Sequence, residues 1–218
     1  MITRTFTNKM KKESNKRIIF YDFETTGFNP YHSEIIEIGA LDNYGNTFNL
    51  LLKPTTPLRP RITEITGITN ELLNEQGVSQ KEGLSTFNDF LNKYDDLFKQ
   101  STYMIAHNNH SFDKLFLSHQ FDKYTIPLQL HDFTFIDTLR ISQLLLGHLY
   151  SHSMNSLCKY FNIVNEDQHR ALGDCKALKK LFEPLQHLFK VKYYTNNIED
   201  INTILDKPFS SKSASQIG

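Results

Sequence analysis

Between residues 17 and 27 the chain is a run of mostly apolar residues that contains two carboxylates and ends at a glycine. The run predicts a strand, in which residues two apart share a face. Asp22 and Glu24 are therefore expected side by side near the carboxyl end of this strand. Like charges this close are costly to ionise unless a cation lies between them, although an acidic pair at an exposed strand end is also common. Their face would also carry Ile18 and Phe20, and the opposite face Ile19, Tyr21 and Phe23.

The pattern of apolar positions predicts the remaining elements as well. Further strands are indicated over residues 35–41, 47–52, 103–106 and 133–137. Helices are indicated over residues 84–99, 112–121, 156–161 and 171–189, after the last strand through Leu146, and at 70–73 with Thr69 as the cap. The segment that contains Pro54, Pro57 and Pro60 is expected to be an extended loop. Three antiparallel strands followed by alternating helices and strands predict an α/β fold, with a mixed five-stranded sheet flanked by helices.

Length and composition favour a single domain. The 218 residues suffice for a domain at 17–190, a basic tail at 1–16 and a polar extension at 191–218 whose end is expected to be disordered. No apolar run is long enough to span a membrane, the first residues lack a secretory signal, and Cys158 and Cys175 fit no disulfide framework or metal spacing. We therefore expect an intracellular, by default cytoplasmic, protein. The 24 basic and 24 acidic residues balance, which argues against non-specific coating of nucleic acid.

Two further carboxylates are expected to point inward. Asp113 lies in the first turn of a predicted helix, ahead of Phe116 and Leu117. Asp174 lies at the start of another, whose face continues with Ala177, Leu178, Leu181 and Leu185. A charged residue on an apolar face is expensive unless it is paired or ligated. Together with Asp22 and Glu24, these residues offer hard oxygen ligands that suit Mg²⁺ or Mn²⁺ rather than zinc.

These segments resemble those of the DnaQ-like, or DEDDh, 3′–5′ exonucleases, which have a ribonuclease H-like fold. The three motifs correspond to residues 22–27, to His107-Asn108 through Phe112-Asp113, and to residues 169–174. Residues 65–73 are similar to the segment that contacts the terminal nucleotide in the proofreading subunits. One departure concerns the second motif: those subunits usually have three residues between its Asn and its Asp, whereas four follow Asn108 here. This difference mildly disfavours the proofreading branch.

The resemblance implies a metal-dependent exonuclease that releases nucleoside 5′-monophosphates from the 3′ end of single-stranded DNA or RNA. Asp22, Glu24, Asp113 and Asp174 would hold two Mg²⁺ or Mn²⁺ ions. His169 would be the general base, because an imidazole titrates near neutrality. The implied substrate contacts are Thr25, Phe28, Ile65, Ile68, His107 and Asn108. An ordinary core or loop position is as compatible with the sequence for Phe28, Ile65 and Ile68, and a structural role for His107.

Two other functions stay open at this point. One is a member of the family that binds nucleic acid or a polymerase without cleaving, and the other is a phosphohydrolase that acts on nucleotides or cyclic phosphates. No residue decides between DNA and RNA. The branches of the family leave a polymerase or a second copy of the chain as partners.

Overall fold

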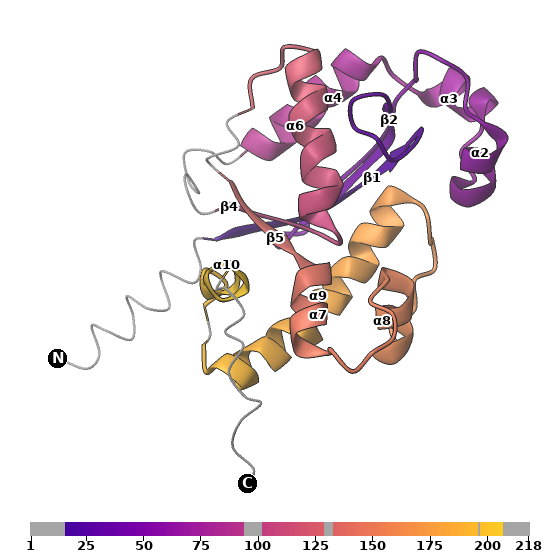
Figure 1. Cartoon of the computed structure of the whole chain (residues 1–218). Coiled ribbons are helices and arrows are strands. Elements are labelled where there is room, and N and C mark those ends of the chain that lie inside the picture. Colours follow the sequence, from indigo (N-terminus) through magenta and orange to yellow (C-terminus); the bar gives the residue numbers. More distant parts are fainter. Residues whose placement is uncertain (1–15, 94–101, 129–132, 196, 207–218) are drawn as a thin grey trace, which may run out of the picture.

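The computed structural model describes residues 16–93, 102–128, 133–195 and 197–206, and its centre is a five-stranded sheet with the order β3-β2-β1-β4-β5 (Figure 1). The strands are β1 (Arg17–Thr25), β2 (Ile35–Asp42), β3 (Thr47–Leu51), β4 (Thr102–Ala106) and β5 (Phe133–Asp137). β1, β2 and β3 pair antiparallel, whereas β4 and β5 run parallel to β1. The predicted mixed sheet is confirmed. Because β1, β4 and β5 are parallel, their carboxyl ends meet at one edge of the sheet.

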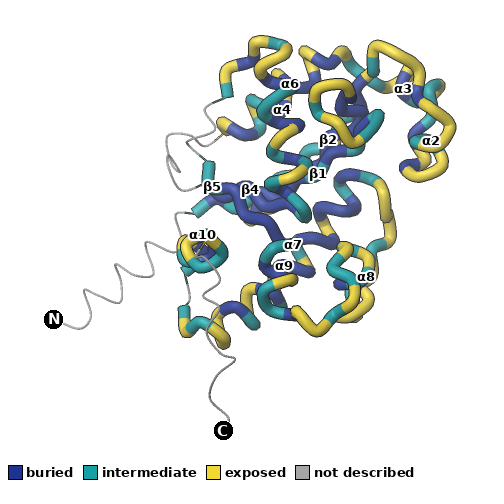
Figure 2. The backbone as a smooth tube through the Cα atoms, viewed as in Figure 1, coloured by how far each residue is buried: buried dark blue, intermediate teal, exposed yellow. Residues whose placement is uncertain are grey.

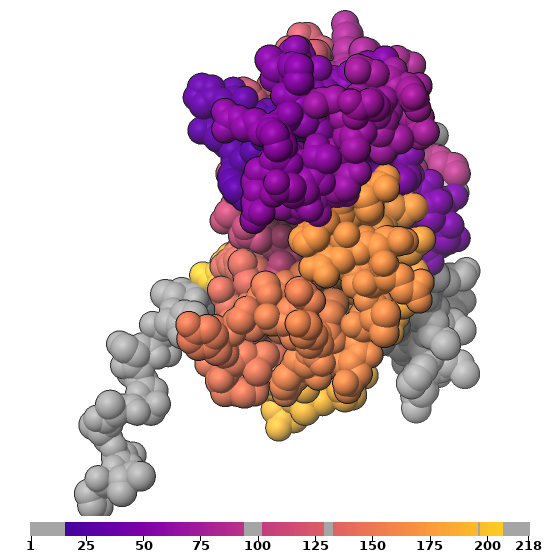
Figure 3. All heavy atoms as spheres, turned by 90° about the vertical axis from the view of Figure 1, so that its right-hand side faces the viewer, coloured from indigo at the N-terminus to yellow at the C-terminus, as the bar shows by residue number. Residues whose placement is uncertain are grey.

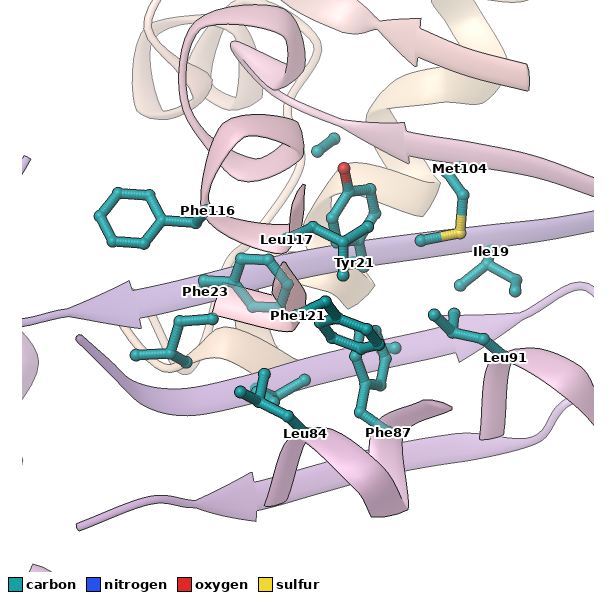
Figure 4. Close-up of a cluster of buried hydrophobic side chains, with 14 of the residues drawn as sticks. Ile19, Tyr21, Phe23, Leu84, Phe87, Leu91, Met104, Phe116, Leu117 and Phe121 are labelled. Atoms are coloured by element: carbon teal, nitrogen blue, oxygen red, sulfur yellow. The ribbon is translucent and has the colours of Figure 1, made fainter. Parts of the chain in front are cut away.

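Helices cover both faces of the sheet (Figure 1). One face carries α4 (Gln80–Asn92) and α6 (Asp113–Lys123), and the other carries α7 (Thr138–Leu145), α9 (Ala171–Tyr193) and α10 (Asp200–Leu205). The two cores divide the side chains of β1 by their alternation: Ile19, Tyr21 and Phe23 enter the first and Phe20 the second, as predicted. Figure 4 shows these first three side chains among residues of α4 (Leu84, Phe87, Leu91) and of α6 (Phe116, Leu117, Phe121).

The remaining helices lie at the margins. Helices α2 (Pro60–Thr66) and α3 (Asn70–Gln76) lie beyond the β2–β3 side and are exposed along much of their length (Figure 2). They enclose a small core of Ile36, Leu51, Leu58, Ile68 and Leu73. Thr69 caps α3, its hydroxyl accepting the N–H of Leu72 at 3.1 Å, as predicted. The short η1 (Asn109–Ser111) follows β4, and α8 (Met154–Tyr160) precedes α9.

Several boundaries differ from the sequence prediction, and three differences matter most for the fold. The extended loop predicted through Pro60 was wrong at its end, because Pro60 begins α2, where its fixed φ and missing N–H suit the first helical turn. Helix α4 begins at Gln80 rather than at residue 84, capped by the hydroxyl of Ser79. In the polar extension, Ile198 and Ile201 are buried, and α10 contacts the sheet through a hydrogen bond from Asn202 Nδ2 to the carbonyl oxygen of Phe135 at 2.7 Å.

Some predictions fall on residues outside the described part. They concern almost all of the N-terminal tail, the end of the helix predicted over 84–99 and the last residues of the extension. Within the described ranges, no helix is both long enough and apolar enough to cross a membrane. Both cysteines, Cys158 and Cys175, are buried and free.

Candidate active site

Strand β1 positions the first two carboxylates. The alternation that buries Ile19, Tyr21 and Phe23 turns Asp22 and Glu24 to the opposite face, toward the start of α9. The pairing of β1 with β2 is irregular between Glu24 and Thr25, directly after the second carboxylate. The acidic pair therefore lies where the regular ladder ends, at the edge formed by the carboxyl ends of the parallel strands.

Helix α9 brings Asp174 to the same place. Ala171, the first residue of this helix, lies against the backbone of Gly39, which pairs with Asp22 across β1 and β2. A Cβ atom on Gly39 would lie 2.2 Å from the carbonyl carbon of Ala171. Only glycine permits this approach. One carboxylate oxygen of each of Asp22, Glu24 and Asp174 lies within 4.8 Å of the others. The predicted grouping of these three residues is therefore seen in the structure.

The fourth carboxylate, Asp113, is the first residue of α6 and is 1% exposed. The backbone of Phe23 in β1 favours the ionised form of Asp113 and lowers its pKa in part, which places the side chain beside the strand that carries Asp22 and Glu24. Its Oδ1 is buried and accepts no hydrogen bond from any described residue. A buried carboxylate oxygen without a donor is expensive, and a cation would satisfy it.

Burial and mutual repulsion hold these carboxyl groups toward their neutral forms. Burial is the largest cause of the raised pKa in each of these groups. The pKa of Asp22 is raised well above its ordinary value, and after burial the main causes are the charges of Asp113, Glu24 and Asp174. The pKa of Glu24 rises to about 8 and that of Asp113 to about 8, and that of Asp174 is raised as well. Divalent cations would reverse these shifts by favouring the ionised forms. An all-oxygen donor set of this charge fits Mg²⁺ or Mn²⁺.

The loop before α9 places His169 beside Asp174. The backbone N–H of His169 donates to Oδ2 of Asp174 at 3.0 Å, and Nδ2 of Asn165 donates to Oδ1 at 2.5 Å. His169 has a left-handed φ of 62°. Its exposed ring has Nε2 3.2 Å from Nε2 of Gln168. Asn165 could not be predicted from the sequence, because no motif includes it.

His107 and Asn108 have local partners. The ring nitrogens of His107 lie 3.0 Å from Oγ1 of Thr138 and 2.9 Å from the carbonyl oxygen of His152, and burial lowers the pKa of this imidazole. Contacts of this kind fit a structural role for His107, which is one of the two alternatives that the sequence leaves open. Asn108 has a φ of 69°, and its backbone N–H donates to Asp137 at 3.0 Å.

The neighbouring Asn109 is completely buried and joins three strands. Its Oδ1 accepts the hydroxyl of Tyr21 at 2.5 Å, and its Nδ2 donates to the carbonyl oxygens of Met104 and Ile136. These bonds hold the segment that leads into Asp113. Counted from Asn109, three residues precede Asp113, which is the spacing usual for the proofreading subunits. The apparent departure in the second motif therefore vanishes if Asn109 is its asparagine.

The residues expected to contact substrate divide into exposed and buried. Phe28 is 87% exposed just after β1, with its ring 6.4 Å from that of Phe112. Ile65 is 37% exposed on α2, and Thr25 is nearly buried, its hydroxyl donating to the carbonyl oxygen of Gly27 at 2.7 Å. Ile68 has no exposed surface and belongs to the small core under α2 and α3. A stacking role for Ile68 was therefore wrong, and the core position that the sequence left open is what the structure has.

A family model described as "Exonuclease" (RNase_T) matches residues 19–182 of the chain. The chain belongs to the DnaQ-like exonuclease family. Among curated members, the PolC-type DNA polymerase III of Mycoplasma genitalium is 34% identical over 90% of this chain, and that of Thermotoga petrophila is 32% identical over 89%. The chain spans only 13% and 14% of the lengths of these two polymerases.

Solved structures of the family share the fold. Escherichia coli exonuclease I in complex with a dT13 oligonucleotide aligns over 86% of this chain and 46% of its own, with a TM-score of 0.70 and 18% sequence identity. A second structure of exonuclease I aligns with a TM-score of 0.68 and 21% identity. The ribonuclease H-like fold expected from the sequence is thereby confirmed. In Figure 3 the purple part of the chain and the salmon-to-orange part meet across this face of the molecule.

Proposed function

We propose that this chain is a divalent-metal-dependent 3′–5′ exonuclease that shortens single-stranded DNA and releases nucleoside 5′-monophosphates. The observation that carries the proposal is the cluster of carboxylates around Asp22, together with the buried Oδ1 of Asp113 that no described residue donates to. DNA is favoured over RNA because the relatives are DNA polymerases by name and the structural neighbour binds a dT13 strand. The 3′–5′ direction follows from the family resemblance.

Each carboxylate has a defined task in this proposal. Asp22, Glu24 and Asp174 would hold one divalent ion, and Asp22 with Asp113 would hold the second. When bound, two such ions stabilise the entering and leaving oxygens of an in-line displacement at phosphorus. The protein keeps the four side chains ready in a largely buried position, so little reorganisation accompanies the reaction.

His169 would take the proton from the attacking water. It is suited to this task because an imidazole accepts a proton near neutral pH. Its backbone N–H already binds Asp174, so the loop holds the base next to a metal ligand. Its exposed ring can turn toward a bound strand without breaking a core contact. Phe28, supported by Phe112, would stack on a terminal base.

A DNA polymerase is the partner that the relatives support. The matched segment makes up about an eighth of the PolC-type polymerase of Mycoplasma genitalium, so a polymerase could present the 3′ end to this chain. A homodimer, the other partner considered from the sequence, has no comparable support. An enzyme that trims genomic DNA works inside the cell, which agrees with the compartment predicted from the sequence.

The test is a gel assay with 5′-labelled single strands of DNA and RNA and a DNA duplex with a mismatched 3′ end, in Mg²⁺ and in chelator. We expect a ladder that shortens from the 3′ end of DNA, needs the metal and disappears in Asp113→Asn. Asp122→Asn is the matched control, because this exposed residue lies on the same helix. Cleavage that persists in chelator would contradict the mechanism. Absence of cleavage would favour the binding-only or small-phosphate function.

A further inference from the structure

An ion pair between a buried glutamate and a partly exposed arginine joins strand β2 to the start of α9. Glu37 is completely buried, and both of its carboxylate oxygens accept hydrogen bonds from Arg170, the residue that precedes the helix. Nε of Arg170 lies 3.2 and 3.1 Å from the two oxygens, and Nη2 lies 2.7 Å from Oε1. The backbone N–H of Ala171 adds a fourth bond to Oε2 at 3.0 Å. The helix is therefore fixed to β2 at its first residue.

The position of Glu37 is unfavourable for a carboxylate with only a stabilising role. It pairs across the strands with Glu24 and lies among carboxylates whose ionisation its charge opposes. An ion pair that includes a buried charge often contributes little net stability, because the cost of desolvating that charge offsets the attraction. A role in positioning the residues of the site explains the presence of this ion pair better than a contribution to stability does.

The residues on either side of Arg170 are the ones proposed to act in catalysis. His169 precedes it directly, and Asp174 follows one helical turn later, its N–H donating to the carbonyl oxygen of Arg170 at 2.9 Å. Two residues along β2 from Glu37, Gly39 admits the backbone of Ala171. The side chain of Glu37 and the bare backbone of Gly39 thus hold the same point of α9 against the sheet.

We propose that Glu37 and Arg170 form a positioning pair that sets where His169 and Asp174 stand relative to Asp22 and Glu24. The pair needs no contact with the substrate to act in this way. Small displacements of reacting groups lower turnover strongly, and residues that support metal ligands commonly affect metal affinity as well. This inference rests on the proposed function, and its test therefore includes a measurement that does not require cleavage.

The decisive variant is the double substitution Glu37→Gln with Arg170→Met, in the full chain. It removes the ion pair but keeps the summed charge of the two positions at zero, so the field at the cluster changes less than in either single variant. We expect kcat to fall about 10- to 100-fold, with KM for the DNA strand within about threefold of the wild-type value. Mn²⁺ affinity, titrated without DNA, should weaken about tenfold.

Arg170→Met alone separates position from charge. Removing a positive charge beside the carboxylates would tighten Mn²⁺ binding if charge alone mattered, because the charge of Arg170 opposes a cation there. Positioning predicts weaker binding. Arg170→Lys keeps the charge but cannot bind both oxygens through a planar guanidinium, and it should give a smaller loss of kcat.

The control is a second arginine–carboxylate pair that involves β2, formed by Arg17 of β1 and Asp42 of β2 at the opposite end of β1. The double substitution Arg17→Met with Asp42→Asn should change the melting temperature but leave kcat and Mn²⁺ affinity within about twofold of wild type. The proposal is overturned if the Glu37–Arg170 double variant keeps both kcat and Mn²⁺ affinity, or if the control loses them equally. If the wild-type chain cleaves no strand, the exonuclease proposal fails, while Mn²⁺ affinity still decides the role of the pair.

Discussion

At the amino end of β1, Asp42 is completely buried and well supplied with donors, whereas at the carboxyl end Asp113 is equally buried with one oxygen unsatisfied. Asp42 pairs with Arg17 at 3.2 Å and accepts hydrogen bonds from the backbone N–H groups of Tyr44 and Asn46 and from Nδ2 of Asn46. Asp42 is the last residue of β2, and Asp113 is the first residue of α6. The difference is in what surrounds the charge.

This contrast indicates which buried charge serves the fold and which serves a ligand. A structural carboxylate is neutralised by the protein itself. The carboxyl groups near Asp22 instead face one another, and burial together with mutual repulsion raises their pKa values. The protein holds them in a position that only cations would make favourable.

The largest expected difference between the two ends is in activity. Asp22→Asn should reduce cleavage by at least about 10⁴-fold, the scale on which essential catalytic groups act. Its melting temperature in chelator should be unchanged or higher, because one repelling charge is removed. Asp42→Asn should destabilise the fold by about 3 kcal/mol, the loss expected when a buried ion pair is broken, yet leave kcat of the folded protein near the wild-type value. The measurements are single-strand cleavage rates and thermal melts of both variants. Retained activity in Asp22→Asn would remove the basis for a metal site at this end.

Replacement of the proposed base should have the next largest effect. His169→Ala should lower kcat by about two to four orders of magnitude, because a positioned general base contributes that much. The Kd for the strand, measured with Ca²⁺ in place of Mg²⁺, should be nearly unchanged. His187→Ala, an exposed histidine farther along α9, is the control and should behave as wild type. A variant of His169 that turns over normally would assign the proton transfer to another group.

A smaller effect is expected from the aromatic side chain next to the acidic end. Phe28→Ala should raise KM about tenfold, because stacking of a base on an aromatic ring contributes about 1–3 kcal/mol. Tyr194→Ala removes a comparably exposed ring, 96% accessible, at the far end of α9 and should change KM little. Equal KM values for both variants would mean that Phe28 does not contact the strand.

Much of the fold and the outline of the site could be predicted from the sequence. The alternation of β1 divides its side chains between two cores as expected, and the helical face of Asp174 is buried with Leu178 and Leu181. These features are periodic, so a local pattern contains them. Helix α2 has no such pattern, and only Pro60 at its first turn indicates it.

Contacts between segments distant in the sequence could not be predicted in the same way. Glu37 and its ion-pair partner Arg170 are separated by 133 positions, and nothing near either residue indicates the other. Asn109 follows another asparagine directly, and only its burial and its bonds to Tyr21, Met104 and Ile136 distinguish the two. Ile68 belongs to a motif that implies contact with the substrate, but its burial depends on how α2 and α3 pack over β2. Such roles are decided by tertiary packing.

The smallest expected effect is on stability as a function of pH. In the folded chain without metal the pKa of Glu24 is about 8, against an ordinary 4.5, and that of Asp113 is about 8, against 3.8. Because the folded state binds these protons more tightly than the unfolded state, their contribution to stability is complete below about pH 4 and is lost as the pH rises through about 8. In chelator the melting temperature should therefore fall between pH 5 and pH 8.5, by about 4 °C or more.

Bound Mg²⁺ and substitution of a carboxylate in the acidic cluster should each weaken the dependence of the melting temperature on pH. Substitution of Asp42, at the other end of β1, should not. Saturating Mg²⁺ stabilises the ionised carboxylates and should raise the melting temperature most at the higher pH, where no proton competes for the oxygens. Glu24→Gln removes one of the raised groups and should reduce the fall in chelator. Asp42→Asn, at the satisfied end of β1, should lower the melting temperature at every pH and leave the fall in place. A wild-type melting temperature that rises from pH 5 to pH 8.5 in chelator would contradict the repulsion on which the comparison of the two ends depends.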